Sequence, residues 1–306
     1  GLCDSLRQYI DPTYSCGEDS VNQDMIISTG GSSYTMRYVG TRMKRYTAFV
    51  ETDEVYAANG IHDLDDLKAH AKQVYDQMFP KDAGLYDDDW TNRKNPLNRF
   101  ISYHLLPYYG AYNDWTVSGD IKNTCAKTDL IDCTDWYTTM LQGTIMKMST
   151  PSDGLFINRK GVGARYTVRG TKVLSPSEIG DVDQQALNGI YHYIDQVLDY
   201  NQETRDVVFN DRIRVMAATL SPEFMNCGAR GNTERATGFK VVEGWDFHGK
   251  TPTMTLRKRD VWMVTYADCI DMVGQFDVTF KLLPVPKEGT YEVRFGYGWG
   301  DMRGKV

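Results

Sequence analysis

Apolar side chains recur at helical spacing in the region after Gly60. The stripe begins next to Asp63, which can cap a helix, and it consists of Leu64, Leu67, Ala71, Val74 and Met78. Residues three and four positions apart lie on the same face of an α-helix, so the pattern predicts an amphipathic helix with one buried face. Pro80 follows the stripe, as is typical of a helix end. A shorter helix is predicted to begin at Thr52-Asp53.

A second apolar stripe lies further along the chain. It consists of Leu97, Phe100, Ile101, His104 and Leu105. Pro107 follows it, so this stripe also predicts a helix that ends before the proline. The spacing places His104 on the apolar face, where we expect a core histidine that hydrogen-bonds to the backbone.

Residues 186–198 alternate as a β-strand does. Asn188-Gly189 favours a type I′ turn, because both residue types tolerate the positive φ that such hairpins need. After the turn, one face of the strand carries Ile190, His192 and Ile194, and the other carries Tyr191, Tyr193 and Asp195. One of these faces should therefore be buried.

Other parts of the chain also predict strands. A turn is expected at residues 30–33, and a hairpin is expected from short strands at 156–158 and 165–168. After residue 200 the predicted strands are 238–242, 253–257, 261–266, 275–283 and 290–295. Turn signals between them favour a β-sandwich. Residues 296–301 alternate glycine with aromatic residues, but no helix follows, so we prefer an aromatic turn to a cofactor loop.

Three segments resemble, in chain order, the signature motifs of the fasciclin domain. Residues 46–56 resemble its first box, residues 97–106 its Tyr-His motif, and residues 188–198 its second box. The resemblance implies that residues 1–200 form an α+β fasciclin domain, a β-sandwich wedge with helices along one edge, whose first helix is missing. The Tyr-His pair of that family has been associated with adhesive surfaces, so Tyr103 is a further candidate contact.

The C-terminal part carries a second resemblance. Residues 276–294 resemble a jelly-roll module that follows fasciclin domains in cell-surface lipoproteins of Gram-negative gut anaerobes. This implies that residues 201–306 hold a connecting segment and an all-β sandwich or jelly-roll domain that is incomplete at its C-terminal end. Both ends of the sequence look cut, so an export signal or lipid anchor is expected outside it.

Composition narrows the class of function. The chain has 306 residues, enough for two domains that each bury a core, and its 41% hydrophobic and 25% charged residues are typical of a globular protein. Its net charge of −7 argues against nucleic acid as a partner, since that affinity needs clustered Lys and Arg. No apolar run approaches the ~20 residues of a membrane-spanning helix.

The six cysteines lie at positions 3, 16, 125, 133, 227 and 269. Pairing between sequence neighbours, 3 with 16, 125 with 133 and 227 with 269, is one of many connectivities. Free buried thiols fit the sequence equally well. No Cys and His spacing suggests zinc.

The sequence contains none of the catalytic motifs that can be recognised from residue spacing. It has no nucleophile elbow, zinc helix or phosphate loop. Asp87-Asp88-Asp89 lacks the alternating ligands and glycine of a calcium loop, so a solvated loop is expected there. We therefore expect neither a cofactor nor a metal. The two carboxylates of a glycoside hydrolase meet only in the tertiary fold, which keeps that class open as an alternative.

Aromatic side chains are the candidates for ligand contacts. The chain has 20 Tyr and 6 Trp, many of them in polar, turn-rich segments where flat rings suit stacking. The candidate contacts are Tyr108, Tyr109, Tyr112, Trp115, Trp245, Trp262, Tyr297 and Trp299. For the first four, packing within a buried hairpin is the alternative.

The resemblance implies a non-catalytic function. It implies a binding or adhesion lipoprotein at the cell surface, anchored by lipid to the outer membrane as an accessory subunit of a nutrient import complex. Its partners would be a TonB-dependent importer and a lipoprotein lid of the starch-utilisation type, and its ligand a glycan or a peptide. The alternatives are a surface glycan hydrolase and a purely structural or cell-contact subunit without a ligand.

Overall fold

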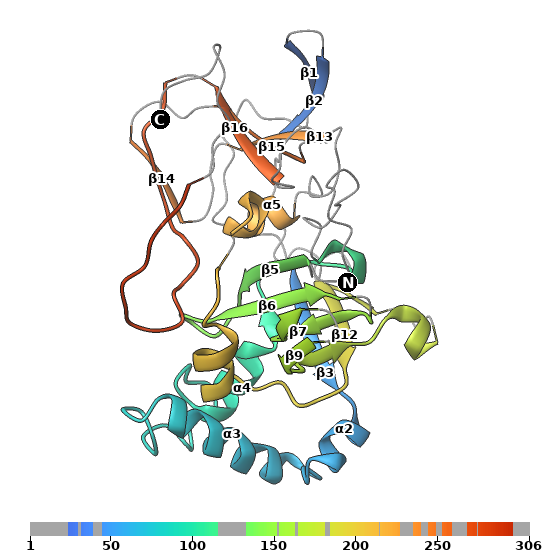
Figure 1. Cartoon of the computed structure of the whole chain (residues 1–306), viewed down its shortest axis with the longest axis vertical. Helices are drawn as coiled ribbons and strands as arrows, with labels where there is room; N and C mark the ends of the chain where they lie inside the picture. Colours follow the sequence, from blue (N-terminus) through green and yellow to red (C-terminus); the bar gives the residue numbers. More distant parts are fainter. Residues whose placement is uncertain are drawn as a thin grey trace, which may run out of the picture.

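The computed structural model is rich in β-strands, with few helices. It describes residues 24–29, 32–38, 45–115, 133–151, 153–162, 165–180, 184–213, 215–226, 235–239, 244–248, 253–258, 268–273 and 275–295. Figure 1 shows a larger sheet in the middle of the molecule, three helices at one end and a five-stranded sheet at the other. The expectation of a β-rich chain is confirmed at this coarse level.

Each of the three helices at one end begins directly after a residue whose side chain caps it. Helix α2 (Asp53–Ala58) is capped by Thr52, and α3 (Leu64–Met78) by Asp63, whose side chain accepts from the N–H groups of Asp65 and Asp66. Helix α4 (Pro96–Tyr103) is capped by Asn95 and has proline at its first position. Side-chain oxygens at these positions satisfy N–H groups that have no partner within the helix. All three predicted helices are confirmed.

The apolar stripe of α4 is only partly buried. Leu97, Phe100 and His104 lie in the interior, as predicted. Ile101, by contrast, is 48% exposed, and Leu105 is half-buried. The stripe is wrong at these two positions, because Ile101 lies on the exposed side of α4 and Leu105 belongs to strand β4 beyond the end of the helix.

The larger sheet is nearly closed into a barrel. Its strands, in order, are β4 (Leu105–Leu106), β3 (Tyr46–Glu51), β12 (Gly189–Ile194), β10 (Thr171–Val173), β7 (Leu155–Ile157), β6 (Ile145–Thr150) and β5 (Cys133–Thr138). β3 and β12 run parallel, and the other neighbours run antiparallel. The two ends of the sheet meet where the Met140 N–H donates to the Leu105 carbonyl at 2.8 Å and the Leu141 N–H to the Ser102 carbonyl at 3.1 Å.

The three segments with fasciclin-like motifs share one core. β3 and β12 pair in register, with Phe49 opposite His192. The Phe49 N–H donates to the carbonyl of His104 at the end of α4. The predicted alternation of β12 is also confirmed, because Ile190, His192 and Ile194 are buried and the tyrosines between them are not.

The turn before β12 differs from the prediction. Strand β11 (Gln185–Ala186) pairs with β12 so that Ala186 faces Gly189, and the two turn residues are Leu187 and Asn188. Gly189 thus lies in the strand. A Cβ there would come within 2.0 Å of the Tyr46 carbonyl oxygen, so this glycine is needed for the close approach of β3.

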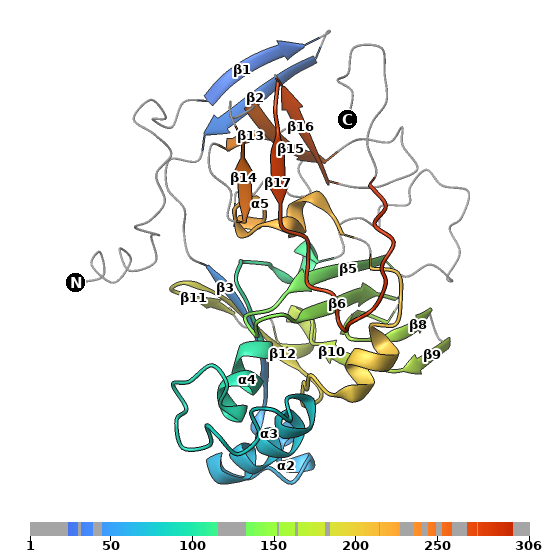
Figure 2. The ribbon, with the colours of Figure 1, turned by 90° about the vertical axis from the view of Figure 1, so that its left-hand side faces the viewer.

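The five-stranded sheet combines both ends of the chain. Its order is β1 (Asp24–Thr29), β2 (Ser32–Tyr38), β13 (Arg235–Phe239), β15 (Thr253–Lys258) and β16 (Asp268–Val273), with β2 and β13 parallel. Two pairs of strands stand apart, β14 (Trp245–Phe247) with β17 (Val278–Phe280) and β8 (Lys160–Val162) with β9 (Arg165–Val168). Figure 2 shows β14 and β17 beside this sheet.

Several strand predictions need correction. Residues 156–158 and 165–168 do not pair with each other, because β7 pairs with β6 and β10 while β9 pairs with β8. Residues 290–295 are exposed and form no strand, since no neighbouring strand in the described chain pairs with them. The predicted strand 261–266 lies outside the described residues. The strand predicted at 253–257 is confirmed.

Residues 204–226 pack against the same core as the residues before 200. They form a π-helical turn η4 (Thr204–Val208), a 3₁₀ turn η5 (Ala217–Leu220) and the short helix α5 (Pro222–Asn226). Phe209 contacts Trp136 with ring centroids 5.3 Å apart, and Phe224 is fully buried. The predicted domain boundary at residue 200 stays a prediction. Two more 3₁₀ turns are η1 (Tyr112–Asp114) and η3 (Pro176–Ile179).

Candidate functional site

Two of the predicted ligand contacts fill the interior. Tyr108 is 1% exposed and Trp115 is 2% exposed. Trp115 meets Tyr137 edge to face at 5.0 Å, and the Tyr108 ring lies 5.8 Å from the same tyrosine. An exposed aromatic platform at these two residues is therefore wrong, because the near-closed sheet has an interior that large rings must fill.

The other predicted contacts are divided between the surface and the undescribed part of the chain. Tyr109 is half-buried, and its hydroxyl accepts a hydrogen bond from the Gln185 side chain at 2.8 Å. Tyr112 is half-buried and packs against the core. Trp245 stacks on Phe280 with centroids 4.8 Å apart. Trp262, Tyr297 and Trp299 lie outside the described residues. The structure thus does not gather the predicted set into one site.

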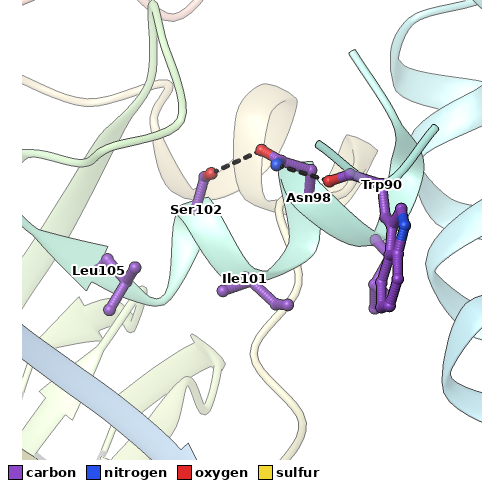
Figure 3. A pocket seen from close by; sticks show the side chains of 6 residues that line it. Trp90, Asn98, Ile101, Ser102 and Leu105 are labelled. Atoms are coloured by element: carbon purple, nitrogen blue, oxygen red, sulfur yellow. Dashed lines mark hydrogen bonds between the residues drawn. The ribbon is translucent and has the colours of Figure 1, made fainter. Parts of the chain in front are cut away.

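A shallow hollow beside α4 is a candidate site within the described part of the chain. Its volume is about 260 Å³, and it is lined by Trp90, Leu97, Asn98, Ile101, Ser102 and Leu105. Trp90 is 66% exposed, although large aromatic side chains are usually well buried. Figure 3 shows the apolar side chains of Trp90, Ile101 and Leu105 pointing to the same side of α4.

Hydrogen bonds tie the backbone at Trp90 to the helix. The Asn98 side-chain amide donates to the Trp90 carbonyl at 2.9 Å, and the Ser102 hydroxyl donates to the Asn98 side-chain oxygen at 3.2 Å (Figure 3). Asn95, the cap of α4, donates to the carbonyls of Tyr86 and Asp87 in the loop before it. The loop that carries Trp90 is therefore tied to the helix at two points.

An ion pair between Arg99 of α4 and Asp82 also anchors the loop that carries Trp90. The Arg99 guanidinium is buried, lies 4.0 Å from the centroid of the Phe79 ring and pairs with Asp82, which Lys94 also contacts at 2.9 Å. The hydrogen bonds from Arg99 and Lys94 hold the pKa of Asp82 below its usual value. The loop is thus anchored on both sides of Trp90, which favours a preformed contact surface.

The lining of the hollow suits binding by contact. Four of its six side chains are apolar, and the other two, Asn98 and Ser102, are neutral and polar. None of the six carries a carboxylate or an imidazole. An aromatic face with a few placed polar groups is the usual make-up of a site that fixes a ligand by orientation and stacking.

A buried polar centre lies where the three motif segments meet. The Glu51 carboxylate accepts hydrogen bonds from His104 Nε2 at 2.8 Å, from the Leu198 N–H at 3.0 Å and from the Tyr56 hydroxyl at 3.0 Å. His104 Nδ1 faces the Phe100 carbonyl at 2.8 Å. Both imidazole nitrogens of His104 therefore face acceptors and carry protons when Glu51 is ionised.

The contacts of this centre shift the pKa of each partner. Burial favours neutral Glu51, but the charge and hydrogen bond of His104 and the Leu198 N–H outweigh burial, so the pKa of Glu51 is lowered. Burial likewise opposes the charged form of His104, but Glu51 outweighs it and raises the pKa of His104. Glu51 and His104 therefore form a buried ion pair, and the prediction of a core histidine bonded to backbone is confirmed.

Two further histidines have structural contacts. His70 on α3 bonds Asp199 at 3.0 Å, and this hydrogen bond raises the pKa of His70. His192 Nε2 bonds the Gly110 carbonyl at 2.9 Å, and burial lowers the pKa of His192. Each histidine thus joins segments distant in sequence.

The described residues hold few other candidates. Across the described ranges, no three His, Cys, Asp or Glu side chains are placed to hold a metal ion. Among the helices that the structure describes, none has the length and apolar character of a membrane crossing. The side chains of all six cysteines fall outside what is described, so their pairing stays a prediction.

Sequence reasoning missed the hollow. It assigned residues 87–89 to a solvated loop and did not use the tryptophan beside them. Asn98 and Ser102 are four residues apart on α4, and Ile101 lies beside Ser102 on the same helix. This pair marks a second, polar face of the helix, and a tryptophan in the polar loop nearby was the signal that could have located the hollow.

Comparisons with known proteins do not assign the chain to a family, since no protein-family model and no curated protein matches it. The resemblance to fasciclin domains therefore stays a prediction from sequence.

Proposed function

We propose that the chain is a non-catalytic binding module that captures a glycan or peptide ligand at the hollow beside α4. The observation that carries the proposal is the exposure of Trp90 on a loop anchored on both sides. Trp90 and the exposed Ile101 line the same hollow, and neighbouring exposed apolar side chains are typical of a binding surface.

A binding function fits the electrostatics better than hydrolysis does. A glycan hydrolase needs two carboxylates in a cleft, one of them with a raised pKa. The hollow has no carboxylate in its lining, and Glu51 in the polar centre is a buried, ionised acceptor with a lowered pKa. These features favour capture of a ligand without chemical change.

The cellular setting follows from the sequence resemblance. It implies a fasciclin domain followed by a β-sandwich, in a lipid-anchored accessory subunit of an outer-membrane importer of the TonB-dependent type. Tethering would raise the effective concentration of a weakly bound ligand at the importer. Purification of the native protein from its membrane with its bound partners tests this setting.

Substitution of Trp90 tests the binding site. We expect Trp90→Ala to weaken binding to the best ligand of a glycan or peptide array at least tenfold, because a central aromatic anchor typically contributes about 2 kcal/mol. Phe276→Ala is the matched control, since Phe276 is an exposed aromatic residue outside the hollow. Equal loss in both variants, or no binding by the unmodified chain, would contradict the proposal.

A further inference from the structure

The hollow beside α4 continues onto the outer face of the larger sheet. Leu105 lines the hollow and lies opposite Ala48, which in turn lies opposite Tyr191. Residues opposite each other in a sheet point to the same side. All three are half-buried, whereas Thr47 and Leu106, one position away, are completely buried. Leu105, Ala48 and Tyr191 therefore form a row on the face turned away from the core.

Two neighbouring residues widen this row. Val50 is 37% exposed and lies opposite Tyr193. The rings of Tyr191 and Tyr193 meet edge to face at 5.5 Å. We call Leu105, Ala48, Val50, Tyr191 and Tyr193 the outer strip. It crosses three strands, so it spans roughly 10 Å beyond the hollow.

The hollow and the outer strip together are uncharged. Their side chains are indole, phenol, aliphatic, amide and hydroxyl groups. Two of the described charged pairs lie beyond β12, since Arg169 contacts Asp195 at 2.6 Å and Lys172 pairs with Glu178. A lining of this kind carries no charge of its own to pair with an acidic or basic polymer, and it matches a neutral ligand.

The edge of the sheet argues against a peptide that adds as a strand. Such a peptide needs unpaired backbone groups along an edge. β4 lies at the edge, but its neighbourhood is joined to the segment after β5 by the hydrogen bonds of Met140 and Leu141. The ligand must therefore lie across side chains, on the face of the sheet.

We propose that the hollow and the outer strip form one elongated site for a linear, uncharged oligosaccharide. The proposal rests on the binding function proposed above and specifies its ligand. A sugar ring has an apolar CH face that packs on aromatic rings, and its hydroxyl groups pair with neutral polar side chains. Trp90, Tyr191 and Tyr193 supply rings along the site, and Asn98 and Ser102 supply polar atoms at one end.

Chain-length dependence tests the proposal. The probes are linear gluco-, xylo- and manno-oligosaccharides, each in short and long chains, with polygalacturonate as an acidic comparison. We expect the long neutral chains to bind more tightly than the short ones. Tyr191→Ala should weaken long-chain binding by about twofold to tenfold, the range of a single ring contact, and leave short chains unchanged. Trp90→Ala should weaken both.

The outcomes distinguish the elongated oligosaccharide site from the more general binding function of the hollow. Because Tyr191 is half-buried, Val50→Asp is a second variant that places a charge on the strip at an exposed position. If Trp90→Ala weakens binding while both strip variants behave like Phe276→Ala, the site ends at the hollow and the present proposal is wrong. Preference for polygalacturonate overturns the neutral ligand class. Absence of binding to every probe overturns the oligosaccharide ligand, and an additional failure on a peptide array overturns the binding function.

Discussion

Glu51 is an interior carboxylate whose three hydrogen-bond donors come from three separate parts of the chain. Tyr56 belongs to α2, His104 ends α4, and Leu198 follows β12. Removing one partner of such a pair leaves the other as an uncompensated buried charge, which costs far more than the pair itself contributes. One residue thus holds together the motif segments on which the fasciclin resemblance rests.

Glu51→Gln is expected to destabilise the fold by about 3–5 kcal/mol, with a defined pH dependence. Because folding raises the pKa of His104, its ion pair stabilises the fold fully below pH 6.5. This stabilisation is lost as the pH rises through the folded-state pKa of His104. Because folding lowers the pKa of Glu51, its ionised form stabilises the fold fully above pH 4.5. This stabilisation is lost as the pH falls through the folded-state pKa of Glu51. Urea unfolding across pH should therefore show the largest difference from the unmodified chain between pH 4.5 and 6.5.

The matched control for this prediction is Glu203→Gln, which changes an exposed carboxylate. It should shift the unfolding free energy by less than about 0.5 kcal/mol. A difference curve for Glu51→Gln that is flat with pH would show that the charge of the pair does not stabilise the fold. Comparing difference curves also removes the acid destabilisation that neutral, buried His192 causes in both proteins.

At the scale of elements, the contact between β3 and β12 depends on a glycine. Gly189→Ala would place a methyl group 2.0 Å from the Tyr46 carbonyl oxygen and push the two strands apart. We expect a loss of about 1–3 kcal/mol in unfolding free energy, the usual cost of overpacking. Gly289→Ala is the control, because its new methyl group would meet its nearest neighbour at 3.6 Å. Equal midpoints for the two variants in urea would refute the account.

The elements differ in how much of them the sequence predicts. α2 and α3 begin at their predicted caps, Thr52 and Asp63, because capping and helical spacing are local. The alternation of β12 is equally local. The partners of β7 and the unpaired state of residues 290–295 depend on contacts far along the chain, and periodicity does not contain them.

The candidate site was harder to predict than the elements. Tyr108 and Trp115 lie in a polar, turn-rich stretch that suggests exposure, yet the nearly closed sheet places them inside. Trp90 lies beside three aspartates and projects from the surface. Local composition is similar in the two cases, so it does not reveal which of these rings face solvent.

At the scale of the whole molecule, the buried core extends past residue 200. Phe209 packs on Trp136, and Lys147 of β6 pairs with Asp211 at 2.9 Å. A chain that ends at residue 200 loses these partners and leaves Trp136 and Tyr200 partly uncovered. A chain that ends at residue 226 keeps them.

We therefore expect the shorter of these two chains to unfold at a lower urea concentration. It should also bind a hydrophobic dye that the longer chain excludes, because exposed aromatic surface is what such dyes detect. Near-ultraviolet circular dichroism checks that both chains are packed before unfolding. Identical midpoints would show that residues 204–226 add no stability to the core.

The backbone and the side chain of Leu105 contribute to two different features of the molecule. Its carbonyl receives the hydrogen bond that brings the first and last strands of the large sheet together, while its side chain forms part of the hollow. A bound sugar would consequently rest on the seam of the barrel and brace it. Slower amide exchange at Met140 in the presence of ligand would show that ligand binding stabilises the hydrogen bonds that join the two ends of the sheet.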